Sequence, residues 1–129
     1  MPTKQTHFSL VPVREKAAAV VLRLLDKKAV DIVALDLSGE NSLYDAVVIS
    51  GARSVRHGQG LAEHLLASAR DDNIEYLHME GYTLGSWILL DFNDLVVHIF
   101  QAESRDLFRL EEMWPKAPIL ADTRRMEQQ

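Results

Sequence analysis

The sequence predicts a single α/β domain in which a mixed five-stranded sheet is flanked by helices. The chain has 129 residues, which is the size of one domain around one hydrophobic core. Segments with the three- and four-residue spacing of amphipathic helices alternate with short apolar segments typical of buried strands. Two of these short segments flank a tight-turn signal. Because a hairpin is antiparallel, the sheet cannot be wholly parallel.

The first helix is predicted to begin at Pro12, which suits a first helical turn. Residues 1–11 show neither the spacing of an amphipathic helix nor the alternation of a strand. We therefore expect a flexible N-terminal arm there and a folded domain over residues 12–118. The helix ends in the basic pair Lys27 and Lys28. Its apolar positions recur at helical spacing: Val13, Ala17, Val20, Val21, Leu24 and Leu25.

Two short apolar segments follow, at residues 32–37 and 46–49. The turn-like residues 38–41 lie between them, and Ser50-Gly51 follows the second. Both segments are predicted to be buried strands that form a consecutive pair.

Ser54 is a plausible N-cap for a second helix that ends near Asp72-Asn73. The apolar side of this helix carries Leu61, Leu65, Leu66 and Ala69. Residues 76–80 are predicted to form a third strand, and residues 81–86 a loop.

Residues 87–91 and 94–100 are predicted to form a hairpin around Phe92-Asn93, because Asn accepts the left-handed backbone of a tight turn. Ser104 can cap a last helix that ends where Trp114-Pro115 breaks the pattern. Its apolar side carries Leu107, Phe108, Leu110 and Met113. Residues 119–129 are expected to form a loose C-terminal tail.

The two faces of the hairpin differ in chemistry. Ile88 and Leu90 share one face, which is aliphatic and belongs to the core. Trp87, Leu89 and Asp91 share the other face. Across the turn this face continues in Asp94, Val96, His98 and Phe100, with Trp87 opposite either His98 or Phe100. An aromatic anchor with an apolar floor and a polar edge is typical of a protein-binding patch. The alternative is that a helix covers this face and Trp87 belongs to the core.

The charge and composition narrow the classes of partner. With 14 Lys and Arg against 19 Asp and Glu the net charge is -5, so we expect a basic protein partner and no direct sequence-specific nucleic acid binding. The chain contains no cysteine, which permits a reducing compartment. No apolar segment is long enough to cross a bilayer, and the N-terminus lacks a signal-peptide pattern, so we expect no membrane contact and a cytoplasmic protein.

Candidate catalytic and ligand sites are sparse. Residues 50–60 run from a strand into a helix, where backbone amides can hold an anion, but they lack a phosphate-loop or dinucleotide motif. A faint resemblance to nucleotidyltransferases, which have a Gly-Ser and paired metal-holding acids, comes from Gly85-Ser86 followed by Asp91 and Asp94. Because these two acids flank a turn, turn formation and solvation are the expected roles. His78 and Glu80 give two potential metal ligands without a third. We therefore expect no cofactor and no enzyme activity, with a nucleotide-binding or nucleotidyltransferase-like enzyme as the alternative.

Residues 80–100 carry a pattern that resembles the ribosomal silencing factors, also called Iojap-like proteins. Its core is Glu80-Gly81-x-x-x-Gly85-x-Trp87-Ile88-Leu89-Leu90-Asp91-x-x-Asp94-Leu95-Val96-Val97-His98-Ile99-Phe100. The resemblance extends over roughly residues 14–114. Asn93 stands where the family usually has Gly, and Asn can adopt the same backbone shape.

This resemblance implies a nucleotidyltransferase-like fold without catalytic residues. It implies binding to the large ribosomal subunit through large-subunit ribosomal protein fourteen, which blocks association with the small subunit and represses translation in starvation or stationary phase. It also implies a homodimer in the free state. The family's contact surface corresponds here to Trp87 and Leu89, with the acids Asp91 and Asp94 as candidates. Tyr82 and Arg105 are expected to neighbour that surface.

Overall fold

A computed structural model of the chain describes residues 10–124. The elements are, in order, α1 (Val13–Asp26), β1 (Val30–Asp36), β2 (Ala46–Ala52), α2 (Val55–Ala69), β3 (His78–Glu80), β4 (Trp87–Asp91), β5 (Leu95–Gln101), α3 (Ala102–Phe108), the 3-10 helix η1 (Leu110–Met113) and β6 (Ile119–Asp122). The strands form one sheet in the order β3-β4-β5-β2-β1-β6. Only β2 and β5 are parallel neighbours, so the predicted α/β domain with a mixed sheet is confirmed.

The predicted number of five strands is wrong, because the sheet has six. Residues 119–122, which the sequence pattern assigned to the tail, pair antiparallel with β1 as the edge strand β6. Backbone pairing thus orders a segment whose side chains show no clear strand periodicity. Residues 125–129 of the predicted tail, and residues 1–9 of the predicted arm, lie outside the described residues.

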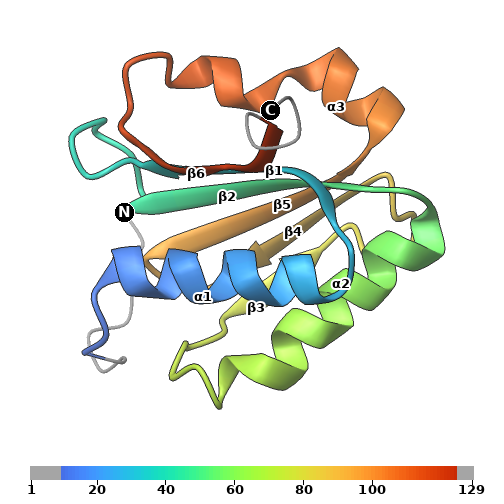
Figure 1. Ribbon diagram of the computed structural model, residues 1–129, viewed down its shortest axis with the longest axis horizontal. Helices are drawn as coiled ribbons and strands as arrows, with labels where there is room; N and C mark the ends of the chain where they lie inside the picture. Colours follow the sequence, from blue (N-terminus) through green and yellow to red (C-terminus); the bar gives the residue numbers. More distant parts are fainter. Residues whose placement is uncertain (1–9, 125–129) are drawn as a thin grey trace.

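Helices cover both faces of the sheet. Helices α1 and α2 lie on one face, and α3 with η1 lies on the other (Figure 1). The core is correspondingly divided in two. The larger cluster lies between the sheet and the α1–α2 layer. The smaller one lies on the α3 side and consists of Val33, Leu35, Leu37, Val47, Ile49, Val96, Phe100 and Ala117.

The predicted hairpin forms, but its turn is shifted by one residue from the predicted Phe92-Asn93, and β5 begins at Leu95. Trp87 pairs with Phe100, and Leu89 pairs with His98. The backbone N–H of Phe92 donates to the carbonyl of Leu95 at 2.9 Å, so Asn93 and Asp94 make a two-residue turn. Asn93 has φ 77°, the left-handed conformation expected of the residue that stands in the place of a glycine.

The helix starts follow local chemistry. Ser54 caps α2, its Oγ accepting from the backbone N–H of His57 at 3.0 Å, as predicted. Pro12 precedes α1, and Lys28, just after its end, takes a positive φ of 63° that stops the helix.

The last predicted helix is broken into two pieces. It begins at Ala102, two residues before Ser104, and no side chain caps it, so the predicted Ser104 cap is wrong. Arg109 takes a left-handed φ of 45°, which ends α3, and η1 follows as a separate turn. The side chains of Leu107 and Phe108 lie outside what the structure describes.

Candidate partner-binding surface

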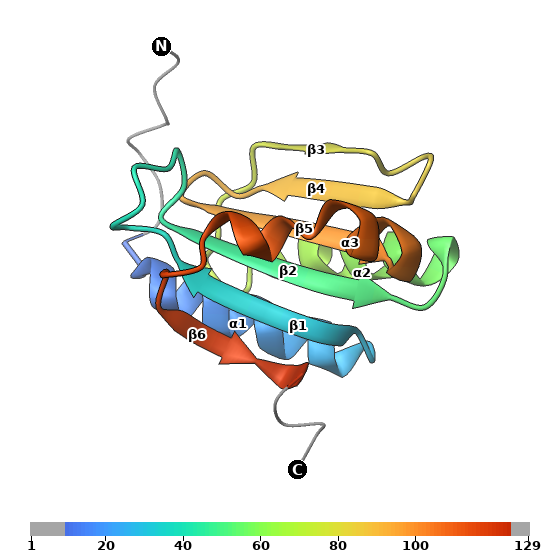
Figure 2. The ribbon, with the colours of Figure 1, turned by 90° about the horizontal axis from the view of Figure 1, so that it is seen from above.

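An open, largely apolar hollow lies at the β3–β4 end of the sheet. Figure 2 shows α3 lying over β5 and β2, which leaves β3 and β4 uncovered on that face. The hollow is lined by Glu80, Gly81, Leu84, Ser86, Trp87 and Leu89, and we call these six residues the Trp87 surface. The face that alternation assigned to Trp87 and Leu89 is therefore covered by a helix at one end and open at the other.

Trp87 is half-buried and held in place by its cross-strand neighbours. Its ring lies 4.7 Å from that of Phe100, centroid to centroid, with the planes inclined at 34°. Its indole N–H donates to Nδ1 of His98 at 2.9 Å. Burial lowers the pKa of His98 to about 4, so the imidazole is neutral at physiological pH and Nδ1 is free to accept. The anchor is thus fixed in orientation before any partner arrives.

The loop between β3 and β4 displays an apolar side chain next to Trp87. Gly81 and Gly85 both have positive φ, 81° and 80°, and the N–H of Gly85 donates to the carbonyl of Gly81 at 2.9 Å. A Cβ at Gly85 would lie 2.5 Å from a methyl of Val55, so only glycine fits against α2 here. This tight loop leaves the side chain of Leu84 78% exposed at the rim of the hollow.

Asp91 shares the strand and the face of Trp87, but its carboxylate is used within the chain. It is buried, accepts from the Tyr44 hydroxyl at 3.0 Å, and accepts from the backbone N–H of Asn93 at 2.8 Å. Burial, together with the hydrogen bond to Asp91, raises the pKa of Tyr44. The hydrogen bonds of Asp91 are those of a group that fixes the hairpin turn.

Asp94 was predicted to share the face of Trp87, but this prediction is wrong. Asp94 is a turn residue before β5, where strand alternation does not apply, and it points to the α1 side of the sheet. Its two carboxylate oxygens each lie 3.2 Å from Nζ of Lys16 in α1, and Lys16 also lies 2.8 Å from Glu75. Burial raises the pKa of Asp94, and the ion pair with Lys16 opposes this shift. Asp91 and Asp94 therefore do not form a pair.

Tyr82 and Arg105 are also held by other parts of the fold. The Tyr82 hydroxyl donates to the carboxylate of Glu63 in α2, and this hydrogen bond raises the pKa of Tyr82. Arg105 pairs with Glu111 at 2.9 Å and donates to the carbonyl of Asp31, which fastens α3 to η1 and β1. Neither side chain lines the Trp87 surface.

Of the six candidate contact residues, the structure thus brings only Trp87 and Leu89 together in the hollow. Sequence reasoning did not identify Glu80 and Leu84 as members of this surface, although the sequence carried a signal for each. Glu80 pairs with Leu89 in the register of β3 and β4, so it shares that residue's face. Leu84 is a large apolar residue in a glycine-bounded loop, where burial is not expected.

Residues 50–60 do not form a separate loop. Ser50, Gly51 and Ala52 continue β2, and the capped α2 begins at Val55. Across residues 10–124, no three His, Asp or Glu side chains are grouped closely enough to hold a metal ion. Within the same span, no helix is both long and apolar enough to cross a membrane.

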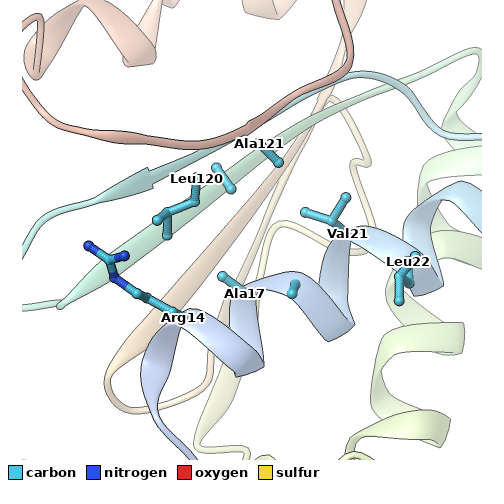
Figure 3. A pocket seen from close by; sticks show the side chains of 8 residues that line it. Arg14, Ala17, Val21, Leu22, Leu120 and Ala121 are labelled. Atoms are coloured by element: carbon cyan, nitrogen blue, oxygen red, sulfur yellow. The ribbon is translucent and has the colours of Figure 1, made fainter. Parts of the chain in front are cut away.

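A second apolar hollow lies on the other face of the sheet, between α1 and the edge strand β6. Figure 3 shows Ala17 and Val21 of α1 on the side of the helix toward Leu120 and Ala121 of β6. Leu22 also lines this hollow. Leu22 is 63% exposed. Because α1 packs on the face opposite to α3, this groove is separate from the Trp87 surface (Figure 1).

Comparisons with known proteins agree on one family. Residues 11–129 match the family described as "Ribosomal silencing factor during starvation". The chain is 37% identical over 93 residues to ribosomal silencing factor RsfS of Halalkalibacterium halodurans, covering 72% of this chain and 80% of that one. It is 28% identical over 100 residues to "Mitochondrial assembly of ribosomal large subunit protein 1" of Mus musculus, covering 74% of this chain and 43% of that one. A crystal structure of a Chromobacterium violaceum protein matches with a TM-score of 0.77 at 28% identity, covering 81% of this chain and 87% of that one.

Proposed function

We propose that this chain, which belongs to the ribosomal silencing factor family, binds the large ribosomal subunit through the Trp87 surface. The partner there is large-subunit ribosomal protein fourteen. The bound factor sterically blocks association with the small subunit and so represses translation in starvation or stationary phase. The name of the mouse relative, which refers to the large ribosomal subunit, supports that choice of subunit.

The observation that carries the proposal is the open half of the α3 face. Trp87 and Leu89 are half-buried there, and on this face no helix of the described chain lies over β3 and β4 (Figure 2). An aromatic side chain fixed by ring packing and a hydrogen bond loses little conformational freedom on binding. The Trp87 surface is therefore suited to a preformed protein contact.

Glu80 takes the role of the acidic rim. Asp91 and Asp94 were candidates for it, but both are engaged within the chain. Glu80 also has a partner within the chain, because its carboxylate lies 2.9 Å from Nε2 of His78, but both side chains are exposed. The side chain of Glu80 is 68% exposed and lines the hollow beside Leu89, so it stays accessible to a partner. A carboxylate at the edge of an apolar contact speeds encounter with a basic ribosomal protein and makes the rate depend on salt.

The proposed action is binding without catalysis, by a nucleotidyltransferase-like fold without catalytic residues. Metal-dependent nucleotidyl transfer needs acids that share one metal. Asp91 bonds Tyr44 on one face of the sheet, whereas Asp94 pairs with Lys16 on the other. That arrangement disfavours the enzyme alternative. The proposal also includes a cytoplasmic location and a homodimer in the free state.

Sedimentation with isolated large subunits, small subunits and joined ribosomes tests the proposal. The wild type should bind large subunits only and should prevent joining. Leu84→Glu is the sharpest variant, because Leu84 is 78% exposed and the change places a charge in the apolar contact. We expect it to weaken large-subunit binding at least about tenfold, which corresponds to roughly 1.4 kcal/mol.

Leu22→Glu is the matched control, since Leu22 is a similarly exposed leucine in the other hollow (Figure 3). It should bind large subunits like the wild type. Trp87→Ala should weaken binding by about 2 kcal/mol or more, and its folding is checked separately because the indole also bonds His98. Equal loss of binding in Leu84→Glu and Leu22→Glu, or no loss in either, would refute the Trp87 surface as the contact.

A further inference from the structure

Four exposed cations gather where the end of α1 meets the start of α2. Lys27 and Lys28 follow α1, and Arg53 and Arg56 flank the first turn of α2. We call these four residues the basic corner. Contacts hold its two halves together: the Arg53 guanidinium donates to the carbonyl of Lys28 at 3.2 Å, and Nε2 of His57 lies 2.8 Å from the carbonyl of Lys27.

The basic corner is set apart by its lack of carboxylate partners. Within residues 10–124, none of its four cations forms an ion pair, and Arg70 and Lys116 are the other exposed cations of that kind. The remaining described cations are paired with carboxylates, namely Arg14, Lys16, Arg23, Arg105, Arg109 and Arg124. The nearby acids Asp26 and Asp31 interact with Arg23 and Arg124 respectively. In a chain of net charge -5, four of the six exposed cations that form no ion pair within residues 10–124 thus lie together.

The basic corner adjoins the Trp87 surface. Val55, which lies between Arg53 and Arg56 in sequence, packs against Gly85 of the β3–β4 loop. Gln101 also connects the two regions. Its side-chain amide donates to the carbonyl of Ser54 at 2.7 Å, and its backbone N–H donates to the carbonyl of Ser86 at 3.1 Å. A partner seated on Leu84 and Trp87 would therefore have the basic corner at its margin.

We infer that the basic corner binds the phosphate backbone of ribosomal RNA beside the protein contact. The inference rests on the proposed function, since a ribosomal surface presents RNA phosphates next to its proteins. Unpaired Lys and Arg side chains bind phosphate by releasing counterions, without reading sequence. The acidic remainder of the chain repels phosphate, so the four cations also fix which edge of the molecule faces the RNA.

The salt dependence of binding to isolated large subunits tests this inference. The double variant Lys27→Gln with Arg56→Gln removes two charges and leaves the structural contact of Arg53 intact. Arg70→Gln with Lys116→Gln removes two exposed, unpaired charges elsewhere and is the matched control. The slope of log affinity against log salt concentration should become shallower by about 1.4 to 1.8 in the first variant. Over a fourfold rise in salt, this variant should therefore lose roughly 7- to 12-fold less affinity than the wild type loses. The control should keep the wild-type slope.

Crosslinking identifies what the basic corner touches. The chain has no cysteine, so Arg56→Cys gives a single site for a benzophenone label, and Arg70→Cys gives the control site. Crosslinks from position 56 to ribosomal RNA, absent from position 70, support the inference. Crosslinks from position 56 to protein alone, or equal salt slopes in both double variants, would overturn it.

The two proposals fail in different ways. If Leu84→Glu binds normally while the Lys27→Gln/Arg56→Gln variant shows the expected shallower salt slope, the inference on the basic corner is supported and the Trp87 surface is refuted as the contact. If the wild type does not bind large subunits at all, the proposed function fails. In that case, binding to a single-stranded RNA of twenty uridines tests the basic corner. The Lys27→Gln/Arg56→Gln variant should bind this RNA more weakly than its control does, and equal binding would overturn the inference.

Discussion

His98 is the residue on which the preorganisation of Trp87 depends. Its Nδ1 accepts the indole N–H, and it can do so only while that nitrogen carries no proton. The centroids of the imidazole and indole rings lie 5.8 Å apart, and His98 as a whole residue is 8% exposed, so a charge there would be poorly solvated. The same burial that lowers the pKa of His98 therefore keeps the anchor in place.

The pH dependence of stability should reveal this neutral imidazole. The folded pKa is about 4 and the ordinary value is 6.5, so between these pH values the unfolded chain binds a proton that the folded chain does not. Stability should consequently rise as pH increases from 4 to 6.5, by at most about 3 kcal/mol from this group. Urea unfolding of the wild type and of His98→Gln measures the effect, because the glutamine cannot titrate. Equal pH slopes in the two proteins would exclude His98 as the source.

Single residues also show how far sequence reasoning reaches. Strand alternation placed Trp87 and Leu89 on one face, and the structure confirms this because periodicity is a local property. Alternation also gave the face of Asp91, but it could not reveal the hydrogen bond from Tyr44, which is 47 residues away. Whether a polar side chain is free for a partner depends on such distant contacts, and the candidate site was therefore only partly predictable.

At the scale of elements, α2 is the most completely determined by its own sequence. Ser54 has the extended backbone of an N-cap and satisfies the N–H of His57, while the apolar side of the helix packs on the sheet. Both signals are local and agree with each other. The helix also positions Val55 against the β3–β4 loop, so its first turn matters to both proposed contacts.

Removal of the cap should therefore be measurable. Ser54→Ala leaves the N–H of His57 without its side-chain acceptor and should lower the free energy of unfolding by about 1 kcal/mol. Ser54→Asp keeps a side-chain oxygen at the cap and should stay within a few tenths of a kcal/mol of the wild type. Thermal or urea unfolding of the three proteins checks the order, and an equal loss in both variants would contradict the capping role.

The elements that sequence reasoning missed are those determined by tertiary pairing. The edge strand β6 has four residues, and its side chains are half-buried or exposed, so its periodicity is weak. It forms because β1 offers an unpaired edge, which a local pattern cannot show. The break at Arg109 has the same kind of cause: the pattern of residues 104–114 fits one helix, whereas Arg105 is held between Glu111 and β1.

For the molecule as a whole, a buried ion cluster ties together segments that are distant in sequence. The side chain of Lys16 in α1 is 0% exposed and pairs with Glu75, before β3, and with Asp94 in the hairpin turn. The sequence pattern did not predict it, because a lysine within an apolar helix face is expected to reach solvent. The cluster fixes the position of α1 relative to the end of the hairpin, on the face opposite to the Trp87 surface.

Lys16→Met should consequently destabilise the whole fold. The methionine fills a similar volume but leaves Glu75 and Asp94 facing each other without a cation, and loss of one partner from a buried ion pair costs about 3–5 kcal/mol. Arg14→Met is the matched control in the same helix, since the side chain of Arg14 is 67% exposed and its pair with Asp36 should contribute less than about 1 kcal/mol. Urea unfolding measures both variants, and a similar small loss in each would show that the cluster does not stabilise the fold.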